Sequence, residues 1–416
     1  MEHADTGDLP AEIRAFYEQH PYPKPVTDLE GYRERWQQGE RRRAAFHLLW
    51  PTQSYRDDLE VLVAGCGTSQ AAKHAMREPL SRVTGVDVSE SSLQHTRELK
   101  RKYEIDNLEL QQVNLEQVET LGRSFDKIVC TGVLHHLPDP DAGLRALRDV
   151  LKPDGAMQLM VYASYGRTGI YMLQEYCRLL GVRAAGKDLA DLGATLGELP
   201  RGHPLAPLLT QAKDFRSAPA LADALLHPRD RAYTVPQLYD WLERCGCAFG
   251  RWSLQAPYLA DCGAVSSTPH AARLAALPAP QQHAALELFR GTMVTHEFSA
   301  NRDDWSSPAQ AIRFDGDSVL DYVPLRSPAA ITVKERLPAG AVAVLINPMH
   351  RHTDIFLPID ASEERLLNAI DGSRTIKEIL RIDADDPQYA ISQESALEFI
   401  ERLWRHDQIV FDASSA

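Results

Sequence analysis

The chain has 416 residues, of which 44% are hydrophobic and 25% are charged, a composition that is ordinary for a globular protein in water. This length exceeds one compact core, so we expect two domains or one heavily decorated domain. No stretch approaches the roughly 20 apolar residues that cross a bilayer, and the N-terminal segment lacks the basic and apolar regions of a secretory signal. We therefore expect a cytoplasmic protein that does not bind membranes, and the net charge of −13 disfavours nucleic-acid substrates.

Cysteine and histidine spacings indicate neither a disulfide framework nor a metal site. Six cysteines are few for this length, and the spacing of Cys245 and Cys247 fits neither a redox motif nor a zinc knuckle, so we expect small buried apolar groups. His350, His352 and Asp354 offer three ligand side chains, but without a further partner we expect no bound metal.

The first 50 residues predict a helical lid. Two short helices are expected around the proline-rich turn at 20–25, and the second helix carries five arginines, which we assign to a solvated face.

From residue 59 the pattern changes to short apolar runs that alternate with helical stretches. The apolar runs predict parallel strands that are buried on both faces, at 59–65, 83–89, 108–114, 125–134 and 156–163. A helical insertion at about 164–230 interrupts the alternation, and the later elements are a helix at 234–247 and strands at 248–255 and 295–302, with a surface loop at 263–283. The fold class is therefore α/β, with a Rossmann-like seven-stranded sheet in a domain that spans 51–305.

The last part of the chain has a different texture. Residues 306–416 predict a β-rich linker and a winged-helix-like α+β module, because β-like runs broken by proline and glycine precede short helices and a final strand. Residues 361–416 hold six Arg and Lys against twelve Asp and Glu. A winged helix that reads DNA should be basic, so we expect a module for protein contact or packing.

Two glycines and an acid stand at the ends of the first two predicted strands. Gly65 and Gly67 follow the first strand and open a helix, where the lack of a side chain lets the backbone approach a ligand. Such a pair also suits a dinucleotide, but the third glycine of that fingerprint is replaced here by Gln70. Asp87 ends the second strand, where a carboxylate can accept hydrogen bonds from both ribose hydroxyls; a surface-turn aspartate is the alternative.

Five segments together resemble the successive motifs of class I S-adenosylmethionine-dependent methyltransferases, in the family's order and spacing. They are VLVAGCGTS (61–69), GVDVS (85–89), the strand that ends at Asn114, FDKIVCTGVLHHLPDP (125–140) and LKPDG (151–155). The resemblance implies S-adenosyl-L-methionine as cofactor and S-adenosyl-L-homocysteine as product. It also implies the cofactor-binding residues, namely Ala64, Gly65, Cys66, Gly67, Asp87, Val88, Asn114, Leu115, Thr131, Gly132 and His136.

Two positions depart from the family's pattern. Many members have an acid in the first strand, where this chain has Val63 or Ala64, so another acid or backbone carbonyls would hold the cofactor's amino group. The third strand usually ends in aspartate, here Asn114, whose amide oxygen can still accept a bond from the adenine amine.

Several side chains are candidates for the chemistry. His135 and His136 either pack structurally or serve catalysis, and His136 is the candidate to face the pocket. A general base helps only if the acceptor loses a proton as it attacks. FYEQHPYP (16–23) resembles the lid segment of some members, which makes Tyr17 a candidate for cofactor binding and Tyr22 for catalysis; aromatic packing is the alternative. Two further candidates line the acceptor pocket: Tyr162, and His296 as a catalytic residue.

The function that we expect is transfer of a methyl group from S-adenosylmethionine to an oxygen, nitrogen or sulfur nucleophile. The acceptor is a small molecule or a peptide or protein. Two alternatives stay open, a non-catalytic scaffold that binds S-adenosylmethionine and an NAD(P)-dependent oxidoreductase.

Overall fold

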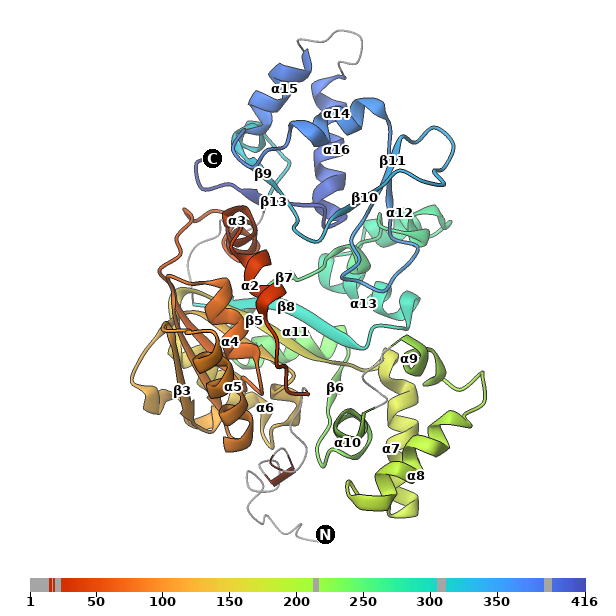
Figure 1. Ribbon diagram of the computed structural model, residues 1–416. Coiled ribbons are helices and arrows are strands. Elements are labelled where there is room, and N and C mark those ends of the chain that lie inside the picture. Colours follow the sequence, from red (N-terminus) through yellow and green to blue (C-terminus); the bar gives the residue numbers. More distant parts are fainter. Residues whose placement is uncertain (1–14, 17, 19–23, 212–216, 305–311, 385–390) are drawn as a thin grey trace. The chain divides into compact units, whose positions relative to one another are not determined.

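The computed structural model describes residues 15–416 except 17, 19–23, 212–216, 305–311 and 385–390 (Figure 1). The chain forms two compact units, one of residues 1–34, 57–249 and 290–304 and the other of residues 35–56, 250–289 and 305–416. The boundaries of these units differ from those of the domains expected at 1–50, 51–305 and 306–416. The division into a lid, a catalytic domain and a C-terminal module stays a prediction.

The central sheet confirms the predicted Rossmann-like α/β class. Its main path has seven strands in the order β3-β2-β1-β4-β5-β8-β7, and β6 pairs with β5. The strands are β1 (Glu60–Ala64), β2 (Arg82–Asp87), β3 (Leu108–Gln112), β4 (Phe125–Thr131), β5 (Leu151–Ala163), β6 (Ala232–Tyr233), β7 (Cys247–Trp252) and β8 (Thr295–Arg302). Neighbours from β3 to β5 are parallel, whereas β8 runs antiparallel to β5.

The order of the strands places a crevice at the carboxyl ends of β1 and β4. The chain moves from β1 outward to β3 and then returns to pair β4 with β1 on the other side. Open α/β sheets bind their ligands at such a reversal, outside the carboxyl ends of the strands.

Helices connect the strands and begin where the sequence supplies a cap. They are α4 (Gln70–Arg77), α5 (Glu90–Lys102), α6 (Pro140–Val150) and α11 (Val235–Arg244). Ser89 accepts a hydrogen bond from the Ser92 amide at the start of α5, and Asp139 caps α6 with Pro140 at its first position. The short helix η1 (Leu115–Leu121) follows β3, and η2 (Leu134–His136) follows β4.

A group of helices stands between β5 and β6, in the segment predicted as an insertion. Its members, which gather together in Figure 1, are α7 (Thr168–Leu180), α8 (Gly186–Gly197), α9 (Ala206–Gln211) and α10 (Ala218–Leu226). Buried leucines such as Leu173, Leu192 and Leu221 form an apolar cluster among these helices. The insertion therefore has a core of its own.

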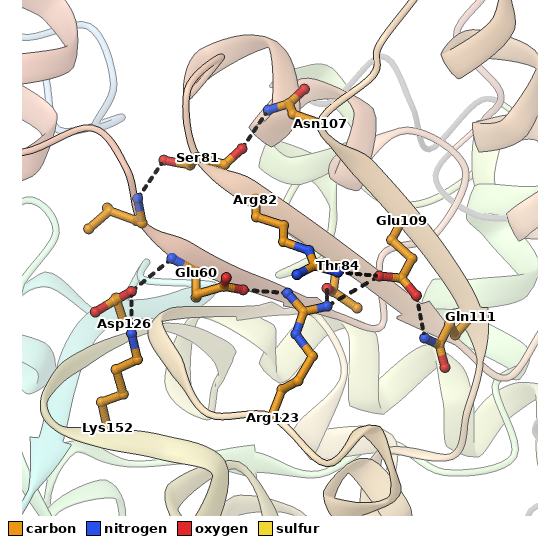
Figure 2. A network of polar contacts seen from close by, with 11 residues as sticks. Glu60, Ser81, Arg82, Thr84, Asn107, Glu109, Gln111, Arg123, Asp126 and Lys152 are labelled. Atoms are coloured by element: carbon orange, nitrogen blue, oxygen red, sulfur yellow. Dashed lines mark hydrogen bonds and ion pairs between the residues drawn. The ribbon is translucent and has the colours of Figure 1, made fainter.

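A polar network ties the amino ends of the strands together, at the edge away from the crevice (Figure 2). Arg123 forms ion pairs with Glu60 of β1 and Glu109 of β3 and donates to the Thr84 hydroxyl of β2 at 3.0 Å. Asp126 accepts hydrogen bonds from the Glu60 amide and the Lys152 ammonium, both at 2.8 Å. This edge therefore stabilises the sheet.

We expect Arg123→Met to lower the free energy of unfolding by about 1–2 kcal/mol, because one bond to a hydroxyl and two partly exposed ion pairs are lost. Chemical denaturation measures the change. Binding of S-adenosylhomocysteine, measured by calorimetry, should not change, because Arg123 lies at the other ends of the strands. A loss of binding without a loss of stability would contradict this separation.

The second unit has its own core of helices and short strands. It holds α3 (Gly39–His47), α12 (Ala271–Ala275), β9 (Val323–Arg326), β10 (Ile331–Val333), β11 (Ala343–Ile346), β12 (Leu357–Ile359), α14 (Ala361–Ala369), α15 (Ile376–Ala384), α16 (Gln393–Arg405) and β13 (Ile409–Asp412). Strands β10, β11 and β12 form one antiparallel sheet, and β13 pairs with β9. The core of this unit includes Leu366, Phe399 and Phe411, which are almost completely buried.

Two expectations about helices differ from the structure. Residues 263–283 do not form a loop, because they contain η6 (Ala264–Ser267), α12 and the start of α13 (Ala279–Arg290). Alanine favours helix, and proline is tolerated in the first turn, so this composition supports short helices. In the N-terminal segment, Ala15, Phe16 and Glu18 are helical before the proline-rich turn as expected, but after the turn there are two helices, α2 (Glu30–Trp36) and α3, in place of one.

A buried aspartate joins α16 to the chain after β7. The Asp407 carboxylate accepts hydrogen bonds from the amides of Gln255 at 3.1 Å and Ala256 at 2.9 Å, and Arg251 lies 3.7 Å away. Burial raises the pKa of Asp407 to about 6, although Arg251 and the two amides act in the opposite direction.

We expect Asp407→Asn to remove a pH dependence of stability. A raised folded-state pKa favours the folded protein while the carboxyl is protonated, so this contribution is present below about pH 4 and is lost as the pH rises through 6. The loss is at most about 2–3 kcal/mol for a shift of two units. Chemical denaturation between pH 4 and 7 compares the two proteins; parallel curves would contradict the prediction.

In the described part of the chain, every helix is too short or too polar to cross a bilayer.

Candidate active site

The loop after β1 has the two left-handed glycines that its sequence suggested, with φ of +66° at Gly65 and +53° at Gly67. A Cβ added at Gly65 would lie 2.2 Å from Cγ2 of Val133, in the loop after β4. The missing side chain at Gly65 thus makes room for Val133. We had expected this space to be occupied by a ligand. The contact brings the β4 loop against the glycine loop.

Asp87 lies directly beside the glycine loop. The Gly67 amide donates to Oδ2 of Asp87 at 2.8 Å, and the Ser89 amide donates to Oδ1 at 2.9 Å. Burial raises the pKa of Asp87, and backbone amides, including those of Ser89 and Gly67, act against that rise. The glycine and the carboxylate that the sequence placed twenty positions apart are in contact.

The residues present fit the nucleoside and amino acid parts of the cofactor. An ionised carboxylate has about four lone-pair positions, and backbone amides use two at Asp87, which leaves acceptors for ribose hydroxyls. At the start of α4, the buried Ser69 hydroxyl has no hydrogen-bond partner among the described residues. A hydroxyl next to the glycine loop can donate to a carboxylate, so Ser69 fits the methionyl end of the cofactor.

The remaining candidates for cofactor binding lie at the carboxyl ends of neighbouring strands. After β3, the Asn114 side chain accepts a hydrogen bond from the Glu116 amide at 3.3 Å and so caps η1, whose first residue Leu115 is buried. After β4, Thr131 accepts from the Gln70 amide group at 3.3 Å. The parallel pairing therefore brings the carboxyl ends of β1, β2, β3 and β4 to one edge of the sheet.

Four further candidates for cofactor binding lie at the ends of β1, β2 and β4. The backbone oxygen of Val88 accepts a bond from the Gln112 side chain at 2.9 Å, and Gly132 has a φ of +77° at the turn where β4 ends. Ala64 and Cys66 are fully buried at the end of β1. Burial raises the pKa of the Cys66 thiol well above its usual range, so Cys66 is not a nucleophile at neutral pH.

His136 is a buried neutral imidazole with a defined tautomer. Its Nδ1 lies 2.6 Å from the Arg229 carbonyl oxygen, which can only accept, so Nδ1 carries the proton. Burial lowers the pKa of His136 to about 4. At neutral pH its Nε2 is therefore unprotonated and can accept a proton, three residues after the Val133 that touches Gly65.

Six planar side chains form a continuous series of tilted or edge-on contacts, which we name the ring column. Successive centres are 4.9, 4.0, 4.2, 3.8 and 3.4 Å apart along the series Phe16, His227, His136, His135, Tyr162 and Arg167. The column joins the N-terminal segment, the β4 loop, the end of β5 and the insertion. Burial lowers the pKa of His227 to about 3, so this ring is also neutral.

A buried ion pair anchors one end of the ring column. Arg167 and Asp230 are 2.8 Å apart, and their side chains are 6% and 3% exposed. Tyr171 accepts a bond from Arg167, and Gln174 donates to Asp230 at 2.8 Å. Sequence reasoning missed these residues because the insertion carries no family motif; the segment HPRD at 227–230 is the signal that could have drawn attention to it.

His296 does not lie in the ring column. It pairs with Val161 across β8 and β5, so its side chain lies on the same face as Val161 and on the opposite face from Tyr162. Its Nε2 is 3.1 Å from the Tyr233 carbonyl oxygen, and the residue is fully buried. This placement gives the predicted catalytic role no geometric support.

Tyr17 and Tyr22 lie outside the described residues. Their described neighbours reach the site, however. Phe16 packs its ring against His227, and the Glu18 carboxylate accepts a bond from the Glu90 amide at 2.7 Å, at the start of α5.

Within the described ranges, no group of three or more His, Cys, Asp or Glu side chains has a geometry that could hold a metal. The rings of His350 and His352 are 6.1 Å apart, and Asp354 accepts a bond from the Ala264 amide at 2.8 Å.

Comparison with known proteins finds a family match over β1 to β5. A family described as "Methyltransferase domain" matches residues 62–157, the segment that carries the glycine loop, Asp87 and both histidines. The chain therefore carries a methyltransferase domain of the class I S-adenosylmethionine-dependent kind. S-adenosyl-L-methionine is the methyl donor of this methyltransferase, and S-adenosyl-L-homocysteine is its product.

Relatives match the methyltransferase over different lengths. An uncharacterized protein of Synechococcus sp. is 28% identical over 389 residues, which cover 90% of this chain and 89% of that protein. A protein named ubiquinone biosynthesis O-methyltransferase, from Neisseria meningitidis serogroup C, is 33% identical over 96 residues, which cover 23% of this chain and 40% of that protein. The match to the second protein thus spans less than half of its length.

A solved structure shares the fold of nearly the whole chain. PKMT2 from Rickettsia typhi in complex with AdoHcy superimposes with a TM-score of 0.62 and 14% identity, and the match covers 91% of this chain and 76% of that one. At this identity the match concerns the fold.

Proposed function

We propose that this methyltransferase transfers the methyl group to the hydroxyl oxygen of a small acceptor, with His136 as the general base. The observation that carries this proposal is the neutral His136 ring, whose Nδ1 is held by the Arg229 carbonyl and whose Nε2 can take a proton. The bound cofactor supplies a methyl group on a sulfonium, which a nucleophile can displace in line.

The chain's own residues hold and orient the reactants. We assign Asp87 and Val88 to the ribose, the glycine loop and Ser69 to the methionyl part, Asn114 and Leu115 to the adenine, and Thr131 and Gly132 to the region of the sulfonium. Displacement of this kind depends largely on positioning, so the fixed contact between Gly67 and Asp87 supports the assignment.

His136 removes the proton that a hydroxyl acceptor must lose. When bound, S-adenosylmethionine would give up its methyl group to the acceptor oxygen and keep the electron pair of the broken carbon–sulfur bond, and Nε2 of His136 would take up the hydroxyl proton. The hydroxyl proton becomes strongly acidic as the oxygen bonds to the methyl carbon. A base with a pKa of about 4 is therefore strong enough to remove it.

Three features favour the hydroxyl group of a small molecule over the other acceptors. A neutral buried imidazole complements an uncharged hydroxyl, whereas an amine is protonated and charged at neutral pH. Two of the relatives, from Neisseria meningitidis and Idiomarina loihiensis, are named ubiquinone biosynthesis O-methyltransferases. A buried base also suits a small molecule, which can enter the site, better than a residue on a folded protein.

Labelled methyl donor tests the proposal. The protein is incubated with S-adenosylmethionine carrying a labelled methyl group and a cell extract, which is then separated into small molecules, protein and RNA. We expect label in small molecules as a methoxy group and none with Asp87→Ala. Label in protein or on nitrogen would overturn the acceptor assignment. Cofactor binding without transfer to any fraction would favour a scaffold, and tighter binding of NADH than of S-adenosylhomocysteine would favour an oxidoreductase.

A further inference from the structure

His135 is a buried imidazole that makes no hydrogen bond within the described part of the chain. It is 1% exposed, and both its Nδ1 and its Nε2 lack a partner there. Its ring faces are occupied, because His136 and Tyr162 lie 4.2 and 3.8 Å away between ring centres. The ring is therefore packed against two tilted rings, and its two polar edge atoms have no partner among the described residues.

The two ring nitrogens of His135 add no hydrogen bond to the described part of the fold. Burial lowers the pKa of His135 well below its usual range, so the ring is neutral and carries one donor and one acceptor. A buried donor or acceptor without a partner destabilises a fold, and an apolar ring would fill the same place without that loss. Unpaired polar groups that destabilise the fold and lie next to a proposed active site are suited to form hydrogen bonds with a ligand.

The neighbours of His135 hold it in one orientation. Tyr162 lies between His135 and the Arg167 guanidinium, which is 3.4 Å from the Tyr162 ring centre. Asp230 compensates the charge of Arg167 in a buried ion pair. His135 therefore lies next to the proposed base, among neutral rings, and the nearby charge of Arg167 is already paired with Asp230.

We propose that His135 is a second acceptor-binding residue, and that the acceptor is an uncharged compound with a second hydrogen-bonding group next to the hydroxyl that is methylated. The proposal rests on the proposed function, since His136 takes the reacting hydroxyl and His135, the preceding residue, takes its neighbour. Charged acceptors are disfavoured because the column offers neutral imidazoles and an Arg167 charge that Asp230 already balances.

Binding of simple probes tests this proposal without turnover. Phenol, benzene-1,2-diol and benzoate are titrated into the full-length protein with S-adenosylhomocysteine present, and the ring signals of His135 and His136 are followed by NMR. The proteins compared are the wild type, His135→Leu, His135→Asn and a control, His95→Leu, which changes a histidine on α5. Melting temperatures are measured for all four.

We expect the diol to bind wild type about fivefold more tightly than phenol, the worth of one neutral hydrogen bond. His135→Leu should bind the two probes equally and melt no lower than wild type, His135→Asn should recover part of the preference, and benzoate should not bind.

Equal affinities for diol and phenol in the wild type, or no binding of either, would overturn the proposal. So would a His135→Leu protein that keeps the preference or melts several degrees lower, because the ring would then be structural. Methyl transfer to nitrogen together with an intact diol preference would instead overturn the proposed function and leave His135 as a binding residue.

Discussion

Replacing Asp87 by alanine should weaken binding of S-adenosylhomocysteine by at least about 100-fold. The proposed site loses two hydrogen bonds from ribose hydroxyls to a charged acceptor, each worth about 1.5–3 kcal/mol. The Gly67 amide also loses its 2.8 Å partner, so the loop that carries it is less well fixed. Isothermal titration calorimetry measures the affinity of both proteins.

The control for this experiment is Asp106→Ala, which removes an exposed carboxylate in the turn before β3 and should leave the affinity unchanged. As the pH decreases, the wild type should begin to lose affinity for S-adenosylhomocysteine at a higher pH than a site with an ordinary aspartate would. The reason is that burial raises the pKa of Asp87. An Asp87→Ala protein with wild-type affinity would remove this residue from the site.

Replacing His136 by glutamine should lower kcat by about 10²–10⁴-fold, the usual contribution of a general base. Affinity for S-adenosylhomocysteine should change little, because His136 acts on the acceptor proton. Initial rates with the acceptor found by labelling measure the effect, and melting temperatures show whether the variant is folded.

The pH profile separates a base from a packing residue. The wild-type kcat should be constant near neutral pH and fall as the pH decreases through about 4, where His136 takes up a proton and can no longer accept one. The glutamine variant should lack this decline. A variant with full kcat, or with the wild-type acid limb, would show that another group takes the proton.

Hydrophobic pattern was sufficient to predict the central strands of the sheet. Each strand of a buried parallel sheet is a short continuous apolar run, and β1, with Val61, Leu62 and Val63 all fully buried, shows why such a run stands out. The last strand was predicted at 295–302 and is found at Thr295–Arg302. The helices at 264–290 were missed because alanine and proline were interpreted as loop signals, although alanine favours helix.

Within the site, local motifs were predictable and tertiary contacts were not. The contact between Gly67 and Asp87 follows from two neighbouring strand ends, which the sequence reveals. In contrast, the stacking of Arg167 on Tyr162 depends on how the insertion folds back, and no motif records it. His296 was chosen for its residue type and its strand, but the pairing with Val161 sets its face.

A crystal structure of the protein with S-adenosylhomocysteine tests the account most directly. We expect both ribose hydroxyls within hydrogen-bond distance of the Asp87 carboxylate, with the sulfur facing the loop of Thr131 and Gly132. The ligand bound elsewhere, or bound here with its ribose turned away from Asp87, would contradict the assignment of this crevice.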